Sequence, residues 1–407
     1  MKEKYLHYLW QNKLLPYHQM TLLSGEYFAV IYPGDYNENE SGPDFFNAQI
    51  QIDGLVWNGN VELHVRSSDW YRHGHQFDPA YSNVILHVVY EFDKDVIIDN
   101  RTIPAIELKN VISVQHYKGY TEFFRRKNKI LCASQFTAVD AINRINMQER
   151  AIIKRLNRKT EFLDEFRGDP HEAFYILVAR AMGAKVNQLP FEELARRLPY
   201  RKIKNVRVND RELVLLQTGG FVVSDKPSEL LSTSKELIRY ENMIGTVNPH
   251  SWKRGGLRPG AAPEVRIRQF AALTHKLDPE LFLQLSDNLD LREYFHGHFS
   301  INKSYSLTHP EYKKLTKWSI DMILINAVAP FLWWFGQIRK DDLLVELAFL
   351  LLRQIPPEQN SIIAKWERLG LHCENAFETQ AMLEIFNEFC FRKKCLSCGI
   401  GKSILGK

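Results

Sequence analysis

The chain has 407 residues, which is too long for one compact unit and suits two or three at ~100–200 residues per domain. Apolar residues make up 45% and charged residues 25%, so disordered, collagen-like and coiled-coil classes are excluded. The net charge of +5, from 53 Lys and Arg against 48 Asp and Glu, is too small to require a nucleic-acid partner by itself.

The N-terminal residues and the cysteine content predict a cytoplasmic protein without a membrane span. Positions 2–4 are charged, and no apolar signal segment follows them. The longest uncharged apolar run, residues 322–338, contains Asn326 and Pro330 and is shorter than the ~20 residues that a span needs. The five cysteines, an odd number, are typical of a reducing compartment.

Residues 1–110 are predicted to form a β-rich domain after a short amphipathic helix. Turn pairs at Asp53-Gly54 and Asn58-Gly59 separate runs of strand-like composition. Strands joined by such short turns pair antiparallel, and residues 97–108 are expected to add a last hairpin. The expected strands cover residues 27–32, 45–52, 55–57, 61–65 and 84–90.

From about residue 139 the apolar period becomes that of helices. Asp169-Pro170 predicts a helix start and Gly183 its end. The predicted fold class is therefore α+β. We expect a mainly antiparallel β domain over residues 1–110, a larger all-α domain over residues 111–372 and a C-terminal cysteine motif over residues 373–407.

An acidic and histidine cluster within residues 42–91 is the main candidate site. Glu62 and His64 are two apart on an expected strand and therefore share a face. A hairpin would bring Asp44 to the end of that strand, where carboxylate oxygens could hold Mg²⁺ or Mn²⁺. The metal candidates in this segment are Asp44, Glu62, His73, His75 and Asp78. His87 lies in an apolar run and is expected to be a core residue.

Pro43-Asp44, followed after eighteen residues by Glu62-Leu63-His64, resembles the Pro-Asp … (Asp/Glu)-x-Lys signature of restriction-endonuclease-like nucleases. The resemblance implies that the two acids hold Mg²⁺ and that the third position activates the attacking water. His64 stands where that family has lysine, so a histidine base with a rate falling below pH ~6.5 is expected. Residues 67–83 predict a loop where the family has a helix.

The chain resembles an uncharacterised bacterial family, the domain of unknown function 2851 group, over most of its length. That family carries no established activity, so the resemblance implies a coherent fold and leaves the reaction open. The matching segments are Gly42-Pro43-Asp44-Phe45, Val61-Glu62-Leu63-His64, Asp69-Trp70, residues 78–89, Leu257-Arg258-Pro259 with Pro263 and Arg266, and the terminal cysteine motif.

Basic clusters follow the acidic segment, since residues 101–160 carry 13 Lys and Arg against 4 Asp and Glu. Such a density of cations predicts contacts with the phosphates of nucleic acid, although solvated helix faces are the alternative. The candidate nucleic-acid-binding residues are Arg125, Arg126, Arg150, Lys154, Arg158, Arg197, Lys253, Arg254 and Arg258.

Three of the five cysteines, Cys390, Cys395 and Cys398, fall within nine residues. This spacing predicts a soft-metal site, either Zn²⁺ or an iron–sulfur cluster. Cys373 is the preferred fourth ligand, with Cys132 and His372 as the alternatives.

Three hypotheses about function follow from these patterns. The first is a Mg²⁺- or Mn²⁺-dependent nuclease with Asp44, Glu62 and His64 as catalytic residues. The second is a non-catalytic nucleic-acid-binding or scaffold protein. The third is a zinc hydrolase that uses His64, His73 and His75 on an unspecified substrate, because imidazoles prefer Zn²⁺.

Overall fold

The computed structural model describes residues 1–17, 20–37, 41–221, 245–301 and 314–405. Two compact units divide the chain: unit 1 combines residues 1–144 with 388–407, and unit 2 spans residues 145–387. These boundaries differ from the expected ones at residues 110 and 372. The reason is that Tyr120, Leu396 and Leu405 pack on the same apolar core as the sheet, so the segments that carry them belong to unit 1.

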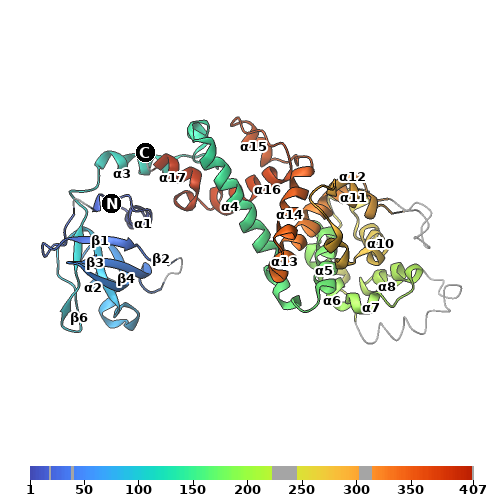
Figure 1. The fold of residues 1–407 in the computed structure, drawn as a ribbon, viewed down its shortest axis with the longest axis horizontal. Coiled ribbons are helices and arrows are strands. Elements are labelled where there is room, and N and C mark those ends of the chain that lie inside the picture. The colour runs from blue at the N-terminus through green and yellow to red at the C-terminus, as the bar shows by residue number, and fades with distance from the viewer. Residues whose placement is uncertain (18–19, 38–40, 222–244, 302–313, 406–407) are drawn as a thin grey trace. The chain divides into compact units, whose positions relative to one another are not determined.

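The sheet of unit 1 is mixed, which the sequence did not predict, although most of its pairs are antiparallel (Figure 1). The strand order is β1-β3-β4-β5-β8, with β2 also paired to β3; β4–β5 and β5–β8 are the parallel pairs. A separate antiparallel hairpin joins β6 to β7. The strands are β1 Phe28–Tyr32, β2 Asp35–Tyr36, β3 Phe45–Ile52, β4 Leu55–Arg66, β5 Val84–Glu91, β6 Ile97–Ile98, β7 Arg101–Thr102 and β8 Ala105–Glu107.

Only one of the two predicted glycine turns exists. Asp53 and Gly54 both have positive φ and join β3 to β4 as expected. The expected turn at Asn58-Gly59 is wrong, because β4 runs through it. A Cβ at Gly59 would lie 2.4 Å from Ile85 Cγ2, so this glycine allows the close approach of β5.

The two faces of the sheet pack against different groups. On one face, α1 (Glu3–Gln11) buries Tyr5, Leu6 and Trp10 in a core that includes Val61 and Leu63 of β4. On the other face, a smaller core forms around Trp70, Tyr81 and Val84. Successive residues of β4 therefore alternate between two buried faces, which leaves Glu62 and His64 on the second one.

Three further helices belong to the two segments of unit 1. Helix α2 spans Asp69–Arg72, α3 spans Val114–Arg125 and α17 spans Gly399–Leu405. Helix α2 and two following 3₁₀ turns lie in the connection between β4 and β5, where the sequence predicted a loop. The connection crosses from one parallel strand to the next, as a parallel pair requires.

Unit 2 is helical, so the α+β fold class is confirmed. Asp169 caps α5 by accepting a hydrogen bond from the Glu172 N–H (3.1 Å), and Gly183 follows its last turn, as predicted. The helices are α4 Ala141–Thr160, which begins in unit 1, α5 Pro170–Met182, α6 Gln188–Arg197, α7 Tyr200–Ile203, α8 Arg211–Thr218, α10 Pro263–Leu273, α11 Leu291–His298, α12 Lys317–Ile323, α13 Ala329–Arg339, α14 Asp342–Gln354, α15 Ile363–Glu367 and α16 Ala376–Glu384.

Helices α12 and α13 form one apolar stretch, Lys317–Arg339, joined by a π-helical turn over Leu324–Val328. Among the described residues, this is the stretch long and apolar enough to cross a membrane by length and composition. However, 89% of its most apolar window is buried inside the protein, as in the core helix of a packed helical domain.

Candidate functional site

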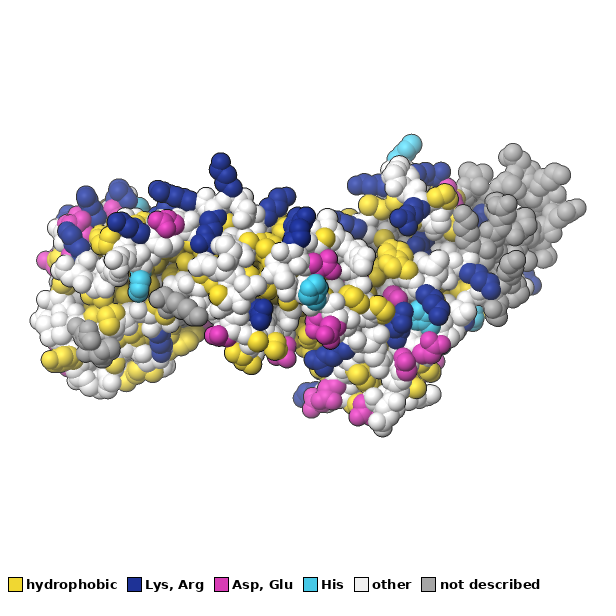
Figure 2. Space-filling model, turned by 90° about the horizontal axis from the view of Figure 1, so that it is seen from above, with side chains coloured by type: hydrophobic (Ala, Val, Ile, Leu, Met, Phe, Trp, Pro, Cys, Tyr) yellow, Lys and Arg dark blue, Asp and Glu magenta, His cyan; other side chains and the backbone are white. Residues whose placement is uncertain are grey.

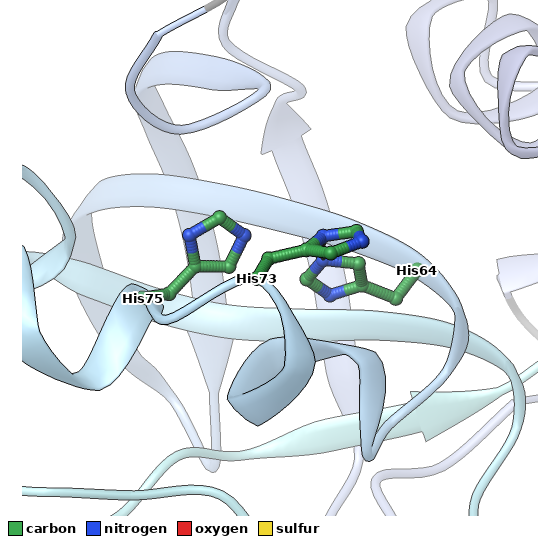
Figure 3. A group of neighbouring side chains, drawn as sticks. All are labelled: His64, His73 and His75. Carbon is green, nitrogen blue, oxygen red and sulfur yellow. Dashed lines mark hydrogen bonds between the residues drawn. The ribbon is translucent and has the colours of Figure 1, made fainter.

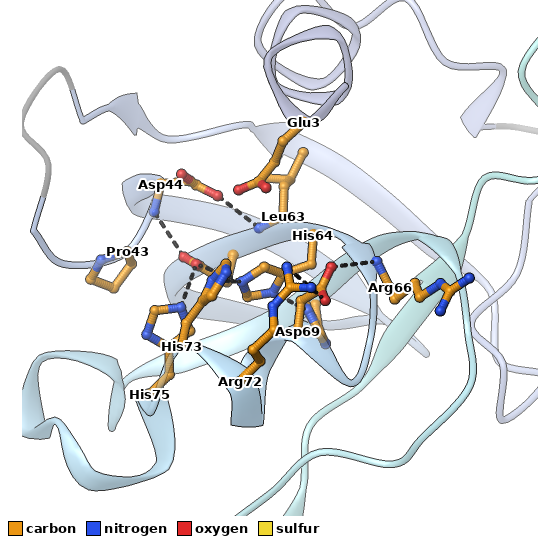
Figure 4. Close-up of polar contacts among 12 residues, drawn as sticks. Glu3, Pro43, Asp44, Leu63, His64, Arg66, Asp69, Arg72, His73 and His75 are labelled. Atoms are coloured by element: carbon orange, nitrogen blue, oxygen red, sulfur yellow. Dashed lines mark hydrogen bonds and ion pairs between the residues drawn. The ribbon is translucent and has the colours of Figure 1, made fainter. Parts of the chain in front are cut away.

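Asp44 and Glu62 lie together because of the register of β3 and β4. Phe45 pairs with Val61, so Asp44, immediately before β3, lies beside Glu62. Each acid is held by the other's strand: the Asp44 N–H donates to Glu62 Oε2 (3.0 Å), and the Leu63 N–H donates to Asp44 Oδ2 (2.9 Å; Figure 4). The sequence predicted that a hairpin would bring the two acids together, and in the structure they lie side by side.

The negative charge of Asp44 disfavours the ionised form of Glu62. Burial and the negative charge of Asp44 raise the pKa of Glu62 to about 9. Glu62 Oε1 faces imidazoles, with His75 Nε2 at 3.3 Å and His64 Nε2 at 3.5 Å. A divalent cation beside the two carboxyls would favour their ionised forms, so the donor set suits a cation that prefers oxygen.

Helix α1 adds Glu3 and His7, which sequence reasoning missed. His7 Nε2 lies 3.2 Å from Asp44 Oδ2 and 3.9 Å from Glu3 Oε1. Burial lowers the pKa of His7, but the carboxylates of Asp44 and Glu3 outweigh it, and the net shift is upward. Ligand atoms of Glu3, His7 and Asp44 all lie within 4.8 Å of one another. The available signal was the i, i+4 spacing of Glu3 and His7 on one face of an amphipathic helix.

Three histidines form a second group on the other side of Glu62 (Figure 3). Ring nitrogens of His64, His73 and His75 lie within 4.8 Å of one another. His64 Nδ1 is 2.9 Å from His87 Nε2, and His64 Nε2 is 3.1 Å from His73 Nδ1. His87 is buried as predicted, and its contact with His64 Nδ1 also holds the His64 ring in place.

His64 cannot titrate in the way that the sequence suggested. Burial and then the neighbouring imidazoles, led by His87, lower the pKa of His64 to about 2. Burial and His75 lower the pKa of His87 to about 3. The prediction of a His64 base that titrates near pH 6.5 is therefore wrong. Both rings are neutral near pH 7, which is the form that ligates metals.

Asp78 acts on His75 through its charge, but it belongs to neither group of clustered ligand atoms among the described residues. Its carboxylate accepts a hydrogen bond from the Ala80 N–H (2.9 Å) and caps a 3₁₀ turn over Pro79–Tyr81. Its side chain is exposed, and it is absent from the groups of described residues whose ligand atoms cluster. The structure therefore gives Asp78 a local capping role.

A groove of about 880 Å³ adjoins the acid pair within unit 1. His7 and Tyr36 line it, and His7 also contacts Asp44. The described residues that line it include no Asp or Glu, and they include the tyrosines Tyr8, Tyr36, Tyr117 and Tyr120. The cationic residues that line the groove are Lys2, Lys4, Lys118, Arg125, Arg392, Lys393 and Lys394.

The basic residues predicted to bind nucleic acid have different surroundings. Arg125 lines the groove, whereas Arg126 donates to the Leu131 carbonyl and the Gln135 side chain, both at 2.9 Å. Lys and Arg side chains occur over both units on the face drawn in Figure 2. Three of the predicted residues in unit 2 form ion pairs: Arg158 with Glu384 (2.6 Å), Arg197 with Glu193 (2.7 Å) and Arg254 with Glu264 (2.7 Å). The other four have exposed side chains: Arg150, Lys154, Lys253 and Arg258.

The predicted cysteine site is divided between the two units. Cys390, Cys395 and Cys398 lie in unit 1 with Cys132, whereas Cys373 lies in unit 2. The charged neighbours of Cys373 are Glu378 and Glu367. Cys132 therefore shares a unit with the three clustered cysteines, whereas Cys373, the preferred fourth ligand, belongs to the other unit.

A family model described as "Protein of unknown function (DUF2851)" matches residues 3–361. The chain belongs to this family. No curated protein and no solved structure matches it. The match covers the acid pair, the histidines and Cys132, and it ends before the three C-terminal cysteines.

Proposed function

We propose that the protein hydrolyses phosphodiester bonds of nucleic acid with a divalent cation held by Asp44 and Glu62. The observation that carries the proposal is the position of this acid pair. Two carboxylates from neighbouring strands converge, and His7 joins them to a groove lined by cations. A polyanion bound in the groove would bring a phosphate towards the acids.

The order of elements supports the nuclease proposal. Helix α1 precedes β1, β3 and β4, and β5 then returns parallel to β4. Pro43-Asp44 stands before β3 and Glu62 stands in β4, so the two acids of the restriction-endonuclease-like signature come from neighbouring strands. Helix α2 lies in the crossover from β4 to β5, so the departure in this connection is smaller than the sequence indicated.

The donor set fits Mg²⁺ or Mn²⁺, which prefer carboxylate oxygens. When bound, such a cation would polarise the phosphoryl oxygen and lower the pKa of water. Four buried imidazole nitrogens have no hydrogen-bond partner among the described residues: His7 Nδ1, His7 Nε2, His75 Nε2 and His87 Nδ1. His75 Nε2 lies 3.3 Å from Glu62, where it can orient the attacking water and accept its proton.

His64 is then a positioning residue. Its ring joins His87 on β5 to His73, next to α2, through the two ring-nitrogen contacts. Its burial excludes it from direct contact with bulk solvent. We therefore assign the role that lysine has in the restriction-endonuclease-like signature to the segment with His73 and His75, and not to His64.

The groove supports nucleic acid as the polyanion. Seven cations can contact successive phosphates, and tyrosine rings such as Tyr117 and Tyr120 offer surfaces on which bases stack. Arg392 of this lining pairs with Glu388 (3.3 Å), and the described lining residues include seven cations and no acid, so the described lining carries a net positive charge.

A zinc hydrolase is the second candidate, and one observation favours it. The ring nitrogens of His64, His73 and His75 already cluster, and imidazole is a ligand that Zn²⁺ prefers. In this alternative Glu62 would accept hydrogen bonds from the ligating rings, as carboxylates around zinc sites commonly do.

Cleavage of a labelled oligonucleotide with Mg²⁺, Mn²⁺ or Zn²⁺ separates the candidates. The nuclease proposal expects Mg²⁺- or Mn²⁺-dependent cleavage that falls about tenfold or more in His7→Gln, because a contact to the acid pair is lost. Activity with Zn²⁺ alone, lost in His73→Gln and kept in His7→Gln, would favour the zinc site. Binding without cleavage under any metal would leave a nucleic-acid-binding protein.

A further inference from the structure

The C-terminal segment returns to unit 1 after the whole of unit 2 has intervened. Residues 388–407 and residues 1–144 form one compact unit, so Cys132 and the three C-terminal cysteines belong to the same body. All four side chains are buried, with exposed fractions of 6–8%. Four buried thiols from two distant segments are an unusual set for a chain whose fifth cysteine is elsewhere.

The C-terminal segment is folded tightly around its three cysteines. The Lys393 N–H donates to the Cys390 carbonyl (3.1 Å), and the Cys398 N–H donates to the Cys395 carbonyl (3.2 Å). Lys393 has a positive φ of 53°, which turns the chain back between Cys390 and Cys395. Helix α17 then begins directly after Cys398, so the backbone presents the three cysteines on consecutive turns.

Helix α17 packs closely against the turn that carries Cys395. A Cβ at Gly401 would lie 2.2 Å from the Cys395 carbonyl oxygen, so only glycine permits the approach. This contact explains the glycine at position 401 by packing.

The fourth cysteine is held in place from the other segment. Arg126 donates hydrogen bonds to the Leu131 carbonyl and to Gln135, which flank Cys132 on either side. The Gln135 N–H also donates to the Cys132 carbonyl (2.9 Å). The turn that carries Cys132 is therefore fixed by polar contacts on both sides.

The four thiols act on one another. Burial first, and then the other cysteines, raise the pKa of Cys132 and of Cys395 to about 12, and the pKa of Cys390 is raised for the same reasons. Each of the six pairs among the four cysteines contributes to at least one of these shifts. The four buried thiols of unit 1 therefore act on one another, and a bound cation would favour their ionised forms.

We propose that Cys132, Cys390, Cys395 and Cys398 form a four-thiolate centre for a soft metal, which fastens the C-terminal segment to the rest of unit 1. Four cysteines complete the ligand set of either a structural zinc ion or an iron–sulfur cluster. Cys373 takes no part in it. Because unit 2 lies between Cys132 and Cys390, the centre closes a very long loop and stabilises the fold at the point where the two segments meet.

Either kind of centre accepts four cysteine ligands. A zinc ion with Zn–S bonds of about 2.3 Å would bring the sulfurs to about 3.8 Å from one another. In an iron–sulfur cluster the thiolates bind different irons and lie further apart.

The test is metal analysis of the full chain, purified without oxygen, with a matched pair of cysteine variants. We expect either zinc, or iron and acid-labile sulfide with a brown chromophore. Cys132→Ser should lower the bound metal about tenfold, and Cys373→Ser should keep it. Either metal with this pattern of loss would support the four-thiolate centre. Wild-type protein without either metal, or equal loss in the two variants, would overturn the proposal.

Alkylation of the wild-type protein tests the same ligand set without any variant. Before chelation, iodoacetamide should modify Cys373 alone, since that cysteine is half-buried and outside the centre. After chelation the other four should react at least about tenfold faster, because metal ligation protects thiolates. An unchanged pattern on chelation, with peptides identified by mass spectrometry, would contradict the centre. Neither experiment depends on phosphodiester cleavage, so the proposed activity can fail without affecting this inference.

Discussion

Replacing Glu62 with glutamine should separate metal binding from stability. The raised pKa of Glu62, caused by burial and by Asp44, means that the side chain is protonated near pH 7 without a cation. Glutamine resembles the protonated acid in size and charge, and its carbonyl can still accept the Asp44 N–H. We therefore expect Glu62→Gln to change the unfolding free energy of the metal-free protein by less than about 1 kcal/mol.

In contrast, Glu62→Gln should strongly reduce the stabilisation that a bound cation gives. At a Mn²⁺ concentration 100 times Kd, a site present only in the native state adds about 2.7 kcal/mol. For a unit of ~150–250 residues each kcal/mol raises Tm by ~2–4 °C, so wild-type protein should gain roughly 5–11 °C. Glu62→Gln should lose most of that gain, because an amide oxygen replaces a charged ligand.

Thermal unfolding with and without Mn²⁺ measures both effects in one series. Asp53→Asn is a matched control, because Asp53 is an exposed acid in the β3–β4 turn, where asparagine is also favoured. The reasoning would be refuted if Glu62→Gln and Asp53→Asn responded equally to Mn²⁺. It would also be refuted if Glu62→Gln melted far below wild type in the absence of metal.

Three further changes test the account of the fold. Asp321→Asn should destabilise unit 2 by about 2–3 kcal/mol in chemical denaturation, because the carboxylate accepts two bonds from Arg292 (2.9 and 3.1 Å) and contacts His296 (2.8 Å); no change would refute this network. Burial raises the pKa of Glu172 to about 7, so its contribution to wild-type stability should fall by about 1 kcal/mol from pH 4.5 to 7. Glu172→Gln should remove that fall, and an identical pH profile would contradict the assignment. Gly59→Ala should cost about 2–4 kcal/mol, because the new methyl meets β5 at 2.4 Å, and a wild-type Tm would show that the strands can separate.

Local patterns in the sequence predicted local structure well. The Asp53-Gly54 turn and the Asp169 cap were predicted from residue types that fix the backbone directly. The proximity of Asp44 and Glu62 also followed, since a short hairpin sets its own register. The Asn58-Gly59 pair has the same appearance as a turn, but its glycine is explained by contact with a strand more than twenty residues away.

Features that depend on long-range packing were beyond the sequence patterns. Glu3 and His7 join the acids only because α1 packs on the sheet, and no local signal specifies that contact. The choice between Cys132 and Cys373 likewise depends on the return of the C-terminal segment to unit 1. The lowered pKa of His64 arises first from burial and then from His87, His75, His73 and His7, which the fold brings together from separate segments of the chain.

The most direct test of the central claim is the rate at which wild-type protein and Asp44→Asn cleave a fluorescent oligonucleotide with Mn²⁺, with Asp53→Asn as the control. The account predicts cleavage by wild type and by Asp53→Asn, and a rate at least about a hundredfold lower in Asp44→Asn, whose circular dichroism should match wild type. Equal rates in all three proteins, or no cleavage by wild type with any divalent metal, would contradict it.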